Sequence, residues 1–274
     1  MAFYSKEMKD SLYAIRDKIV GLHAQCDGTG IVCTNDDFEE CICMKVFRYA
    51  KALIVARIPR AYWTLSLSKM TKVDAHYRKF VQMYLQRFDT ALEKGLGVFF
   101  LGVNGIGKTA LACEIAKTAL MRQKSVLYIT AQYYIDTLYV TDDAVAPFLD
   151  RDVIIFDELD KAYIKEGSTF VPRKVEDFLR RSLSAGAVII LCTNMNEESS
   201  DPNEETIATT FGESLVSMLK RQIKFVHMDG EDVSNSLHSG WMSRLKEDYD
   251  FFSPDLVKAA KLYSARRASL GKVR

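Results

Sequence analysis

A glycine-rich loop at residues 102–109 limits the fold of this chain more than any other feature. It reads Gly-Val-Asn-Gly-Ile-Gly-Lys-Thr, follows a short apolar run at 98–101 and precedes a helical stretch at 110–121. A strand that passes through such a turn into a helix points several backbone N–H groups at one place, where the helix N-terminus already favours negative charge. The pattern therefore predicts a phosphate-binding loop between a strand and a helix.

The residues of this loop have distinct predicted roles around a nucleoside triphosphate. The expected contacts come from Gly102, Val103, Asn104, Gly105, Ile106, Gly107, Lys108 and Thr109. The glycines permit positive φ and a close approach of the backbone to phosphate. Lys108 would reach the β- and γ-phosphates, and the Thr109 hydroxyl would ligate Mg²⁺. The sequence thus predicts ATP and Mg²⁺ as cofactors.

Two adjacent carboxylates, Asp157 and Glu158, follow a second apolar run at 153–156. A continuous apolar run is typical of a central parallel strand that is covered on both faces. Ligands of open α/β sheets bind at the carboxyl ends of the strands, so both carboxylates should lie beside the loop. Asp157 is then the Mg²⁺ partner, and Glu158 is the base that orients and deprotonates the attacking water. Without the loop, the pair would be read as surface residues.

A third apolar run, at 188–192, ends in Thr193 and Asn194. A polar side chain at the tip of the strand next to the Asp157 strand can hydrogen-bond the attacking water or the γ-phosphate. We expect Asn194 to have this "sensor" role. The alternative interpretation is that Thr193 and Asn194 are ordinary turn residues.

Composition sets broad limits on the chain. Its 274 residues suit one large domain plus a small one, and 37 basic against 36 acidic residues give a net charge of +1 that favours no particular partner. The sequence has no run of about 18 apolar residues and no apolar core of a signal peptide near Met1. We expect a cytoplasmic protein without a membrane partner, in which the cysteines are thiols or metal ligands and not disulfides.

Basic residues are concentrated in two stretches that contain no acidic residue. Between 44 and 73 they are Lys45, Arg48, Lys51, Arg57, Arg60, Lys69 and Lys72. Between 256 and 274 they are Lys258, Lys261, Arg266, Arg267, Lys272 and Arg274. Such stretches could meet phosphate backbones. Solvated helix faces are the alternative explanation.

Four cysteines and a histidine lie close together near the N-terminus. His23 and Cys26 form one pair and Cys41 and Cys43 another, joined by a turn-rich loop. Two such pairs predict a small tetrahedral Zn²⁺ site. Cys33 is either a spare thiol or a replacement for His23, and four unlinked thiols remain the alternative.

The rest of the chain alternates strands and helices. Helices are expected at 8–22, at 52–58 with an end at Pro59, and at 80–94 with an end at Gly95. Strands are expected near 98–101, 126–129, 153–156, 188–192 and 223–228, and a loop at 196–205. This order predicts a doubly wound parallel sheet with helices on both faces. The predicted domains are an N-terminal helix with the zinc module at 1–62, a linker region at 63–94, the P-loop core at 95–235 and a basic helical extension at 236–274.

The arrangement of these motifs resembles one family. The zinc segment, the basic helix, the stretch Ile58-Pro-Arg-Ala-Tyr-Trp63 and a P-loop module ending in Phe211-Gly-Glu213 and Gly230-Glu-Asp232 are similar to DnaC-type (DnaC/IstB-like) helicase loaders. These are AAA+ ATPases of bacteria and phages, and the resemblance spans roughly residues 20–235. It implies ATP hydrolysis, self-association into an oligomer, and loading of a DnaB-type hexameric replicative helicase onto single-stranded DNA during replication. It also implies that the N-terminal module grips the helicase.

The resemblance assigns roles to individual residues. Lys108 and Thr109 match the Walker A motif, Asp157 and Glu158 match Walker B, and Asn194 matches sensor 1.

Three departures from the family pattern stand out. The family usually begins its zinc site with cysteine where this chain has His23, which is also able to ligate Zn²⁺. Arginines, including the arginine finger, are expected at two positions that hold Ser214 and Met218 here. We therefore take Arg221, with Lys220 as a substitute, as the candidate finger. The family also often closes with an arginine where this chain has Ser234.

Three functions remain open on the sequence alone: a helicase loader, an IstB-like helper ATPase in transposition, and a nucleotide-gated adaptor that does not hydrolyse ATP. The zinc segment favours the loader, because transposition helpers commonly carry a helical N-terminal region. The presence of Glu158 argues against the adaptor, which would have no use for that carboxylate.

Overall fold

The structure, a computed structural model, describes residues 6–21, 26, 28–34, 37–138, 146–162, 170–201, 204–234 and 251–271. The chain forms two compact units. The smaller comprises Met1–Thr64, Leu120–Gln123 and Gly240–Arg274, and the larger comprises Leu65–Ala119 and Lys124–Ser239. Over the described ranges, no helix has both the length and the apolar character needed to cross a membrane.

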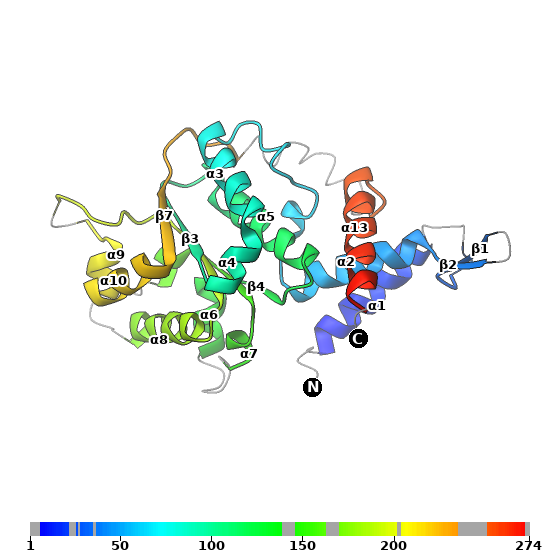
Figure 1. Cartoon of the computed structure of the whole chain (residues 1–274). Helices are drawn as coiled ribbons and strands as arrows, with labels where there is room; N and C mark the ends of the chain where they lie inside the picture. The colour runs from blue at the N-terminus through cyan, green and yellow to red at the C-terminus, as the bar shows by residue number, and fades with distance from the viewer. Residues whose placement is uncertain are drawn as a thin grey trace. The chain divides into compact units, whose positions relative to one another are not determined.

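The larger unit is built on a five-stranded parallel sheet with the strand order β4-β5-β6-β3-β7 (Figure 1). Its strands are β3 (Gly97–Leu101), β4 (Val126–Thr130), β5 (Val153–Asp157), β6 (Val188–Thr193) and β7 (Ile223–His227). Each of the five predicted strands overlaps an observed strand. The predicted doubly wound parallel sheet is therefore confirmed.

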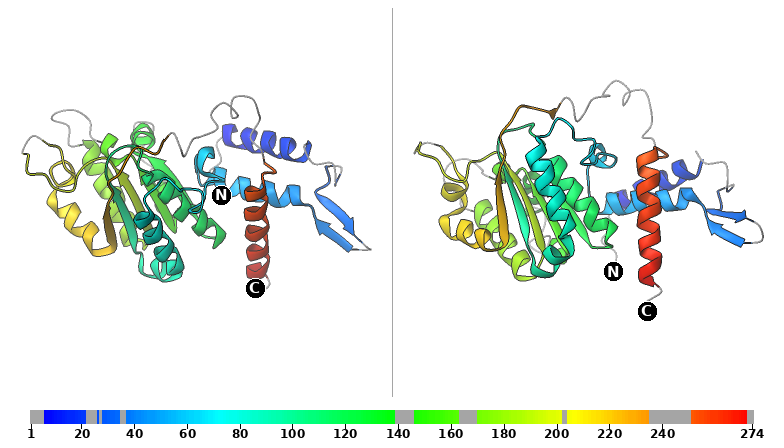
Figure 2. Two further views of the ribbon diagram at one scale, coloured as in Figure 1. Left: turned by 90° about the horizontal axis from the view of Figure 1, so that it is seen from above. Right: turned by 45° about the horizontal axis from the view of Figure 1, so that its top comes forward.

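Helices cover both faces of this sheet, as Figure 2 shows. Alternate strand residues such as Phe99, Ile154 and Ile189 share a buried cluster with residues of the helices on one face. These helices are α6 (Ala131–Leu138), α8 (Phe170–Ser184), α9 (Ile207–Phe211) and α10 (Glu213–Gln222), with the short α7 (Ala146–Leu149) and the 3₁₀ helix η2 (Leu159–Ala162) nearby. The other face carries α3 (Ala75–Gln86), α4 (Phe88–Lys94) and α5 (Lys108–Met121). Burial of all residues of β3, β5 and β6 follows from this double covering.

The single helix predicted at 80–94 is wrong, because the segment forms two helices, α3 and α4. Arg87, at φ −108° and ψ 20°, leaves the helical region and caps both of them. The break places Phe88 in the core with no exposed surface. The end at Gly95 is as predicted, since this residue adopts the left-handed conformation at φ 62°.

The described residues of the smaller unit form three α-helices, a short 3₁₀ helix and a hairpin. The elements are α1 (Lys6–Gly21), β1 (Ile31–Thr34), β2 (Asp37–Glu40), α2 (Ile42–Val55), η1 (Arg60–Tyr62) and α13 (Pro254–Gly271). The predicted amphipathic helix is confirmed by α1, whose Leu12, Ile15 and Ile19 are buried. Both α1 and α13 pack against α2 (Figure 1). The antiparallel hairpin β1–β2 was not predicted.

Helix α2 ends at Val55, before the predicted stop at Pro59. Arg57 adopts φ 61°, and its N–H donates to the Ile54 carbonyl at 2.9 Å, while the Ile58 N–H donates to the Leu53 carbonyl at 3.0 Å. These two bonds are the Schellman motif, which satisfies the last carbonyls of a helix. The motif was not predicted, because Arg57 occupies the left-handed position where glycine is usual.

Trp63 is buried and closes the turn after α2. Its indole N–H donates to the Ile58 carbonyl at 2.8 Å, and its ring lies 6.5 Å from that of Phe251. The stretch at residues 60–63 is therefore a short 3₁₀ helix that ends on a packed side chain. The spacing of Ile58 and Trp63 in the sequence is explained by this bond.

Gly97 is the position where β3 tolerates no side chain. A Cβ atom there would lie 2.0 Å from the carbonyl oxygen of Ile189 on β6. We expect Gly97→Ala to force the two strands apart and to lower the free energy of unfolding of the larger unit by about 1–3 kcal/mol or more. Chemical denaturation followed by circular dichroism measures this loss.

The control is Gly21→Ala, because nothing lies within 4 Å of a Cβ atom built there. We expect this variant to change stability by less than about 0.5 kcal/mol. Equal stability of the two variants would contradict the close approach of β3 and β6.

Candidate functional site

The predicted nucleotide-binding residues meet at the carboxyl edge of the parallel sheet. The loop at 102–107 joins β3 to α5, Asp157 is the last residue of β5, and Thr193 is the last residue of β6. Strand β6 pairs with β5 on one side and with β3 on the other. The three strand ends are therefore neighbours, as the open-sheet rule requires of a ligand site.

Two glycines of the loop have positive φ and are closely approached by the segment that follows β7. Gly102 has φ 143°, and a Cβ atom there would lie 2.1 Å from the Met228 carbonyl oxygen. Gly105 has φ 81°, a Cβ atom there would lie 2.0 Å from Asp232 Oδ1, and its carbonyl accepts from the Val233 N–H at 3.0 Å. The segment after β7 thus holds the loop in shape, and nothing in the sequence indicated this.

Lys108 is buried at the centre of the loop. Its Nζ donates to the carbonyls of Gly102 at 2.7 Å and Val103 at 2.6 Å, and to Asn194 Oδ1 at 3.0 Å. Burial lowers the pKa of Lys108, and the nearby acidic groups oppose this shift. The ammonium group is thereby held where the loop would receive phosphate oxygens.

Thr109 and Asp157 form the pair that fits Mg²⁺. The Thr109 hydroxyl donates to Asp157 Oδ2 at 2.9 Å, and the Glu158 backbone N–H donates to Asp157 Oδ1 at 2.9 Å. A hydroxyl and a carboxylate side by side offer the hard oxygen ligands that Mg²⁺ requires.

Tyr128 on β4 is a member of the site that sequence reasoning missed. Its hydroxyl donates to Asp157 Oδ2 at 2.7 Å, and burial and then the charge of Asp157 raise the pKa of this tyrosine. Strands β4 and β5 pair with Tyr128 opposite Ile155, which brings the ring toward Asp157. A tyrosine in an apolar run carries no signal of such a contact until the strand order is known.

Glu158 lies at the turn from β5 into η2 in a strained conformation. Its φ is 56°, which is uncommon for a residue other than glycine. Its carboxylate pairs with Lys161 Nζ at 2.5 Å and is partly exposed. The structure therefore places Glu158 directly after Asp157 in the chain, with its carboxylate held by Lys161.

Asp160 is the second residue that sequence reasoning missed. Its Oδ1 accepts from the Asn194 backbone N–H at 3.0 Å, and its Oδ2 accepts from Asn194 Nδ2 at 3.0 Å. Asn194 is thus fixed by Asp160 on one side and contacts Lys108 with its carbonyl oxygen on the other. The available signal was the spacing Asp157-Glu-Leu-Asp160, two residues beyond the predicted base.

Three of the predicted zinc ligands come together in the smaller unit. The sulfur atoms of Cys26, Cys41 and Cys43 lie within 4.8 Å of one another, all three residues are buried, and the sulfurs of Cys26 and Cys43 are 3.4 Å apart. Cys33 is exposed on β1, and His23 lies outside the described residues. The hairpin supplies the geometry, because the Cys41 N–H donates to the Gly30 carbonyl at 2.9 Å.

The chemistry of this thiol cluster (Cys26, Cys41 and Cys43) suits a soft divalent cation. Burial raises the pKa of the Cys43 thiol to about 12, and the other two cysteines add to the shift. A bound cation reverses this effect, because a coordinating thiol is deprotonated outright. Three buried sulfurs this close together could hold Zn²⁺, for which cysteine thiolates are common ligands.

The predicted finger Arg221 lies at the end of α10. It lines a groove of about 600 Å³ together with Leu96 and Gly97 at the start of β3 and Ile223 at the start of β7. This is the amino edge of the sheet, away from the loop of the same chain. Its role as a finger stays a prediction.

A different arginine contacts the two positions where arginines were expected. Arg180 of α8 donates to Ser214 Oγ at 3.0 Å and lies 3.3 Å from Met218 Sδ. Glu176 orients its guanidinium through an ion pair at 2.6 Å. Sequence reasoning missed Arg180, because only the packing of α8 beside α10 brings it there.

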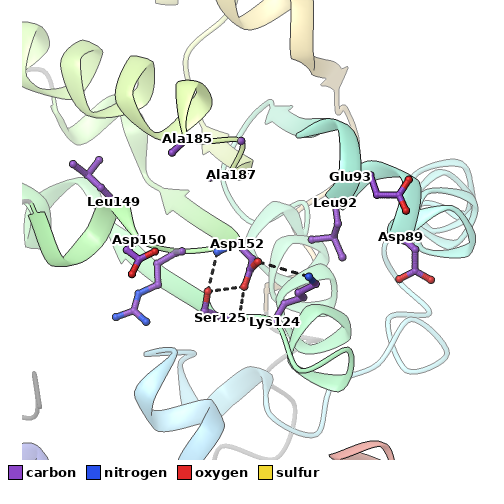
Figure 3. Close-up of a pocket in the computed structure, with 12 residues that line it drawn as sticks. Asp89, Leu92, Glu93, Lys124, Ser125, Leu149, Asp150, Asp152, Ala185 and Ala187 are labelled. Carbon is purple, nitrogen blue, oxygen red and sulfur yellow. Dashed lines mark hydrogen bonds and ion pairs between the residues drawn. The ribbon is translucent and has the colours of Figure 1, made fainter. Parts of the chain in front are cut away.

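A second hollow, of about 490 Å³, lies at the amino edge of the sheet (Figure 3). Asp152, just before β5, accepts from the Ser125 N–H and hydroxyl at 2.7 Å each and lies 3.8 Å from Lys124 Nζ. These contacts tie together the starts of β4 and β5. The predicted nucleotide-binding residues belong to the opposite edge.

No protein-family model matches this chain, and no curated protein matches its sequence. Solved structures match its fold. The DnaC helicase loader has 18% identity and a TM-score of 0.51, covering 62% of this chain and 100% of that one. The DnaI structure has 17% identity and a TM-score of 0.51, covering 64% and 93%. Domain III of the Thermotoga maritima replication initiation protein DnaA has 16% identity and a TM-score of 0.51, covering 77% and 87%.

At these identities the likeness concerns the fold. Together with the strand order β4-β5-β6-β3-β7, it gives the larger unit the predicted α/β fold, with a strand order that is typical of AAA+ modules. The larger unit thus shares its fold with the solved DnaC, DnaI and DnaA structures.

The contact between Asp160 and Asn194 can be measured by a double-mutant cycle. We expect Asp160→Ala and Asn194→Ala to be coupled by about 0.5–3 kcal/mol in the free energy of unfolding, because each leaves the other's hydrogen bonds unmade. Denaturant titrations of the two single variants and the double variant give the coupling.

The matched control is the exposed pair of Asn196 and Glu204, whose amide and carboxylate lie 2.6 Å apart. We expect this pair to couple by less than about 0.5 kcal/mol, because water replaces its bond. Additive effects of Asp160 and Asn194 would show that Asp160 does not position the asparagine.

Proposed function

We propose that this chain is an ATP-hydrolysing loader that binds a DnaB-type hexameric helicase and places it on single-stranded DNA during replication initiation. The observation that carries the proposal is the contact chain from Lys108 through Asn194 to Asp160, beside the pair of Thr109 and Asp157. These are the parts that a P-loop ATPase needs. The likeness of fold to a DnaC helicase loader supports the choice of loader.

The proposed hydrolysis uses the residues of the carboxyl edge. The loop N–H groups and Lys108 bind the phosphates, and Thr109 and Asp157 would hold Mg²⁺, which would neutralise charge on the phosphate oxygens. Glu158 accepts the proton of the attacking water. To do so, its carboxylate must leave its ion pair with Lys161 and bind the water. Asn194 orients the water or the γ-phosphate.

The two Walker residues should fail in different ways. We expect Lys108→Ala to abolish ATP binding, because it removes the buried cation of the loop. We expect Glu158→Gln to bind ATP and to slow its hydrolysis by about 10²-fold or more, because it removes the base. Binding is measured with a fluorescent ATP analogue, and turnover by phosphate release.

The control is Lys94→Ala, an exposed lysine of α4, which should behave as the parent does. Parental turnover by Glu158→Gln would show that another group is the base.

The thiol cluster should hold one Zn²⁺ per chain, with His23 as fourth ligand. We expect Cys41→Ser to lose the metal and Cys33→Ser, the matched control on the exposed face of β1, to keep it. Zinc binding to small modules is worth about 10–16 kcal/mol, so its removal should unfold residues 20–45 and spare the AAA+ core. Elemental analysis measures the metal, and protein that is purified without chelator and contains no zinc would contradict the assignment.

We propose that neighbouring subunits of an oligomer complete each other's nucleotide sites, with Arg221 or Arg180 as the cation supplied in trans. Mixing Lys108→Ala subunits with Arg221→Ala subunits, or with Arg180→Ala subunits, tests both candidates. A true finger variant should lose turnover by about 10³-fold or more, since a finger is worth about 10³–10⁵ in rate. The mixture should restore part of it in the presence of single-stranded DNA.

If neither arginine variant loses turnover, the finger lies elsewhere or the chain works without one. If an arginine variant loses turnover and no mixture restores it, that arginine has a structural role.

The identity of the partner tests the loader against its alternatives. We expect the parental protein with ATP to capture a hexameric helicase from native lysate, and Cys41→Ser bait to capture less of it. Capture of a transposase instead would favour the IstB-like function. Purified protein that binds ATP without hydrolysing it would favour the adaptor. Such a result would agree with the absence of the expected arginines at Ser214 and Met218.

A further inference from the structure

The two acid-free basic stretches of the sequence meet in the smaller unit. One supplies α2 and the other supplies α13, and these helices pack together with the rings of Tyr49 and Tyr263 5.5 Å apart. Figure 2 shows α13 crossing α2 near the hairpin. Segments that lie about two hundred residues apart in the sequence therefore place their cations on one surface.

This packing leaves a cationic pocket of about 420 Å³. It is lined by Glu40, Lys45, Arg48, Lys261, Ser264, Ala265, Arg267 and Ala268. The small side chains of Ser264, Ala265 and Ala268 share one face of α13 and leave the room that the pocket occupies.

The pocket has more positively than negatively charged side chains in its lining. Arg48 forms a two-pronged ion pair with Glu40, in which Nη1 donates to Oε2 at 2.9 Å and Nη2 donates to Oε1. Within the part of the chain that the structure describes, Lys45, Lys261 and Arg267 have no carboxylate partner. Three positive charges thus face one opening without a counter-charge.

A polar group of the pocket also lacks a partner. Ser264 is buried, with 7% of its surface exposed, and its hydroxyl oxygen has no hydrogen bond among the described residues. A hydroxyl that is left unsatisfied in this way costs stability unless a bound group or water meets it. The cations that line the opening are what a phosphate group requires, whereas the Ser264 oxygen has almost no exposed surface of its own.

We propose that this pocket binds the phosphate backbone of single-stranded nucleic acid. A backbone fits better than a single phosphate, because Lys261 and Arg267, which both line the pocket, lie six residues and therefore about 9 Å apart along α13, while Lys45 adds a third cation from α2. The inference concerns the smaller unit and does not depend on hydrolysis in the AAA+ module. It rests on the proposed function only in naming single-stranded nucleic acid as the ligand in place of a duplex.

The test measures binding of a labelled oligothymidylate by fluorescence anisotropy, without nucleotide and in full-length Lys108→Ala protein. We expect Lys261→Glu with Arg267→Glu to weaken binding about ten-fold or more and to reduce the slope of log affinity against log salt by about two. The control, Lys94→Glu with Arg173→Glu, makes the same change in net charge at exposed positions of the larger unit and should bind as the parent does.

Circular dichroism shows whether each variant folds, and Lys261→Gln with Arg267→Gln replaces the charge reversal if that variant does not. Parental affinity in the pocket variant, or equal weakening in the control, overturns the proposal. Titration with inorganic phosphate separates the two sources of the ligand: saturation by phosphate without binding of the oligonucleotide overturns the assignment to nucleic acid. A pocket variant that binds the oligonucleotide normally and loses only a protein partner overturns it as well.

ATP turnover of the same pocket variant with Lys108 restored separates this proposal from the proposed function. Loss of DNA binding with unchanged turnover supports the pocket. Normal DNA binding in a chain that hydrolyses ATP overturns the pocket and leaves the ATPase standing.

Discussion

The buried ammonium group of Lys108 is the interaction on which the candidate site depends. A charge this deep in the protein needs acceptors in place of water, and it has two loop carbonyls and Asn194. Asn194 in turn is held by Asp160. The lysine, the asparagine and the aspartate come from three different elements, so the site exists only when these elements are docked in their native order.

The strand order decides which elements those are. Because β6 lies between β5 and β3, its last residues stand between the carboxylates of β5 and the loop after β3. The same order puts Tyr128 of β4 beside Asp157 and leaves no space for a side chain at Gly97. The apolar strands that build the core therefore also set the positions of the polar residues at their ends.

The smaller unit depends on contacts between distant segments in a similar way. The β1–β2 hairpin brings Cys26 toward Cys41 and Cys43, and α13 returns from the end of the chain to pack on α2. A unit of this size buries a limited core, so a metal site is a physically reasonable source of additional stability. Its two proposed ligands, a cation and a polyanion, would occupy separate places: the buried thiol cluster and the cationic pocket.

Local patterns of the sequence determined the glycine-rich turn between β3 and α5, the five strands and the three cysteines that cluster. Each of these depends on neighbouring residues, through hydrophobic runs and the conformational freedom of glycine. The break at Arg87 and the arginine in the cap of α2 escaped prediction because packing outweighed the usual residue preferences. Tyr128, Asp160, Arg180 and the cationic pocket were decided by the tertiary structure alone. Their contacts join elements far apart in the sequence, and the pattern within one element carries no information about which other element will lie beside it.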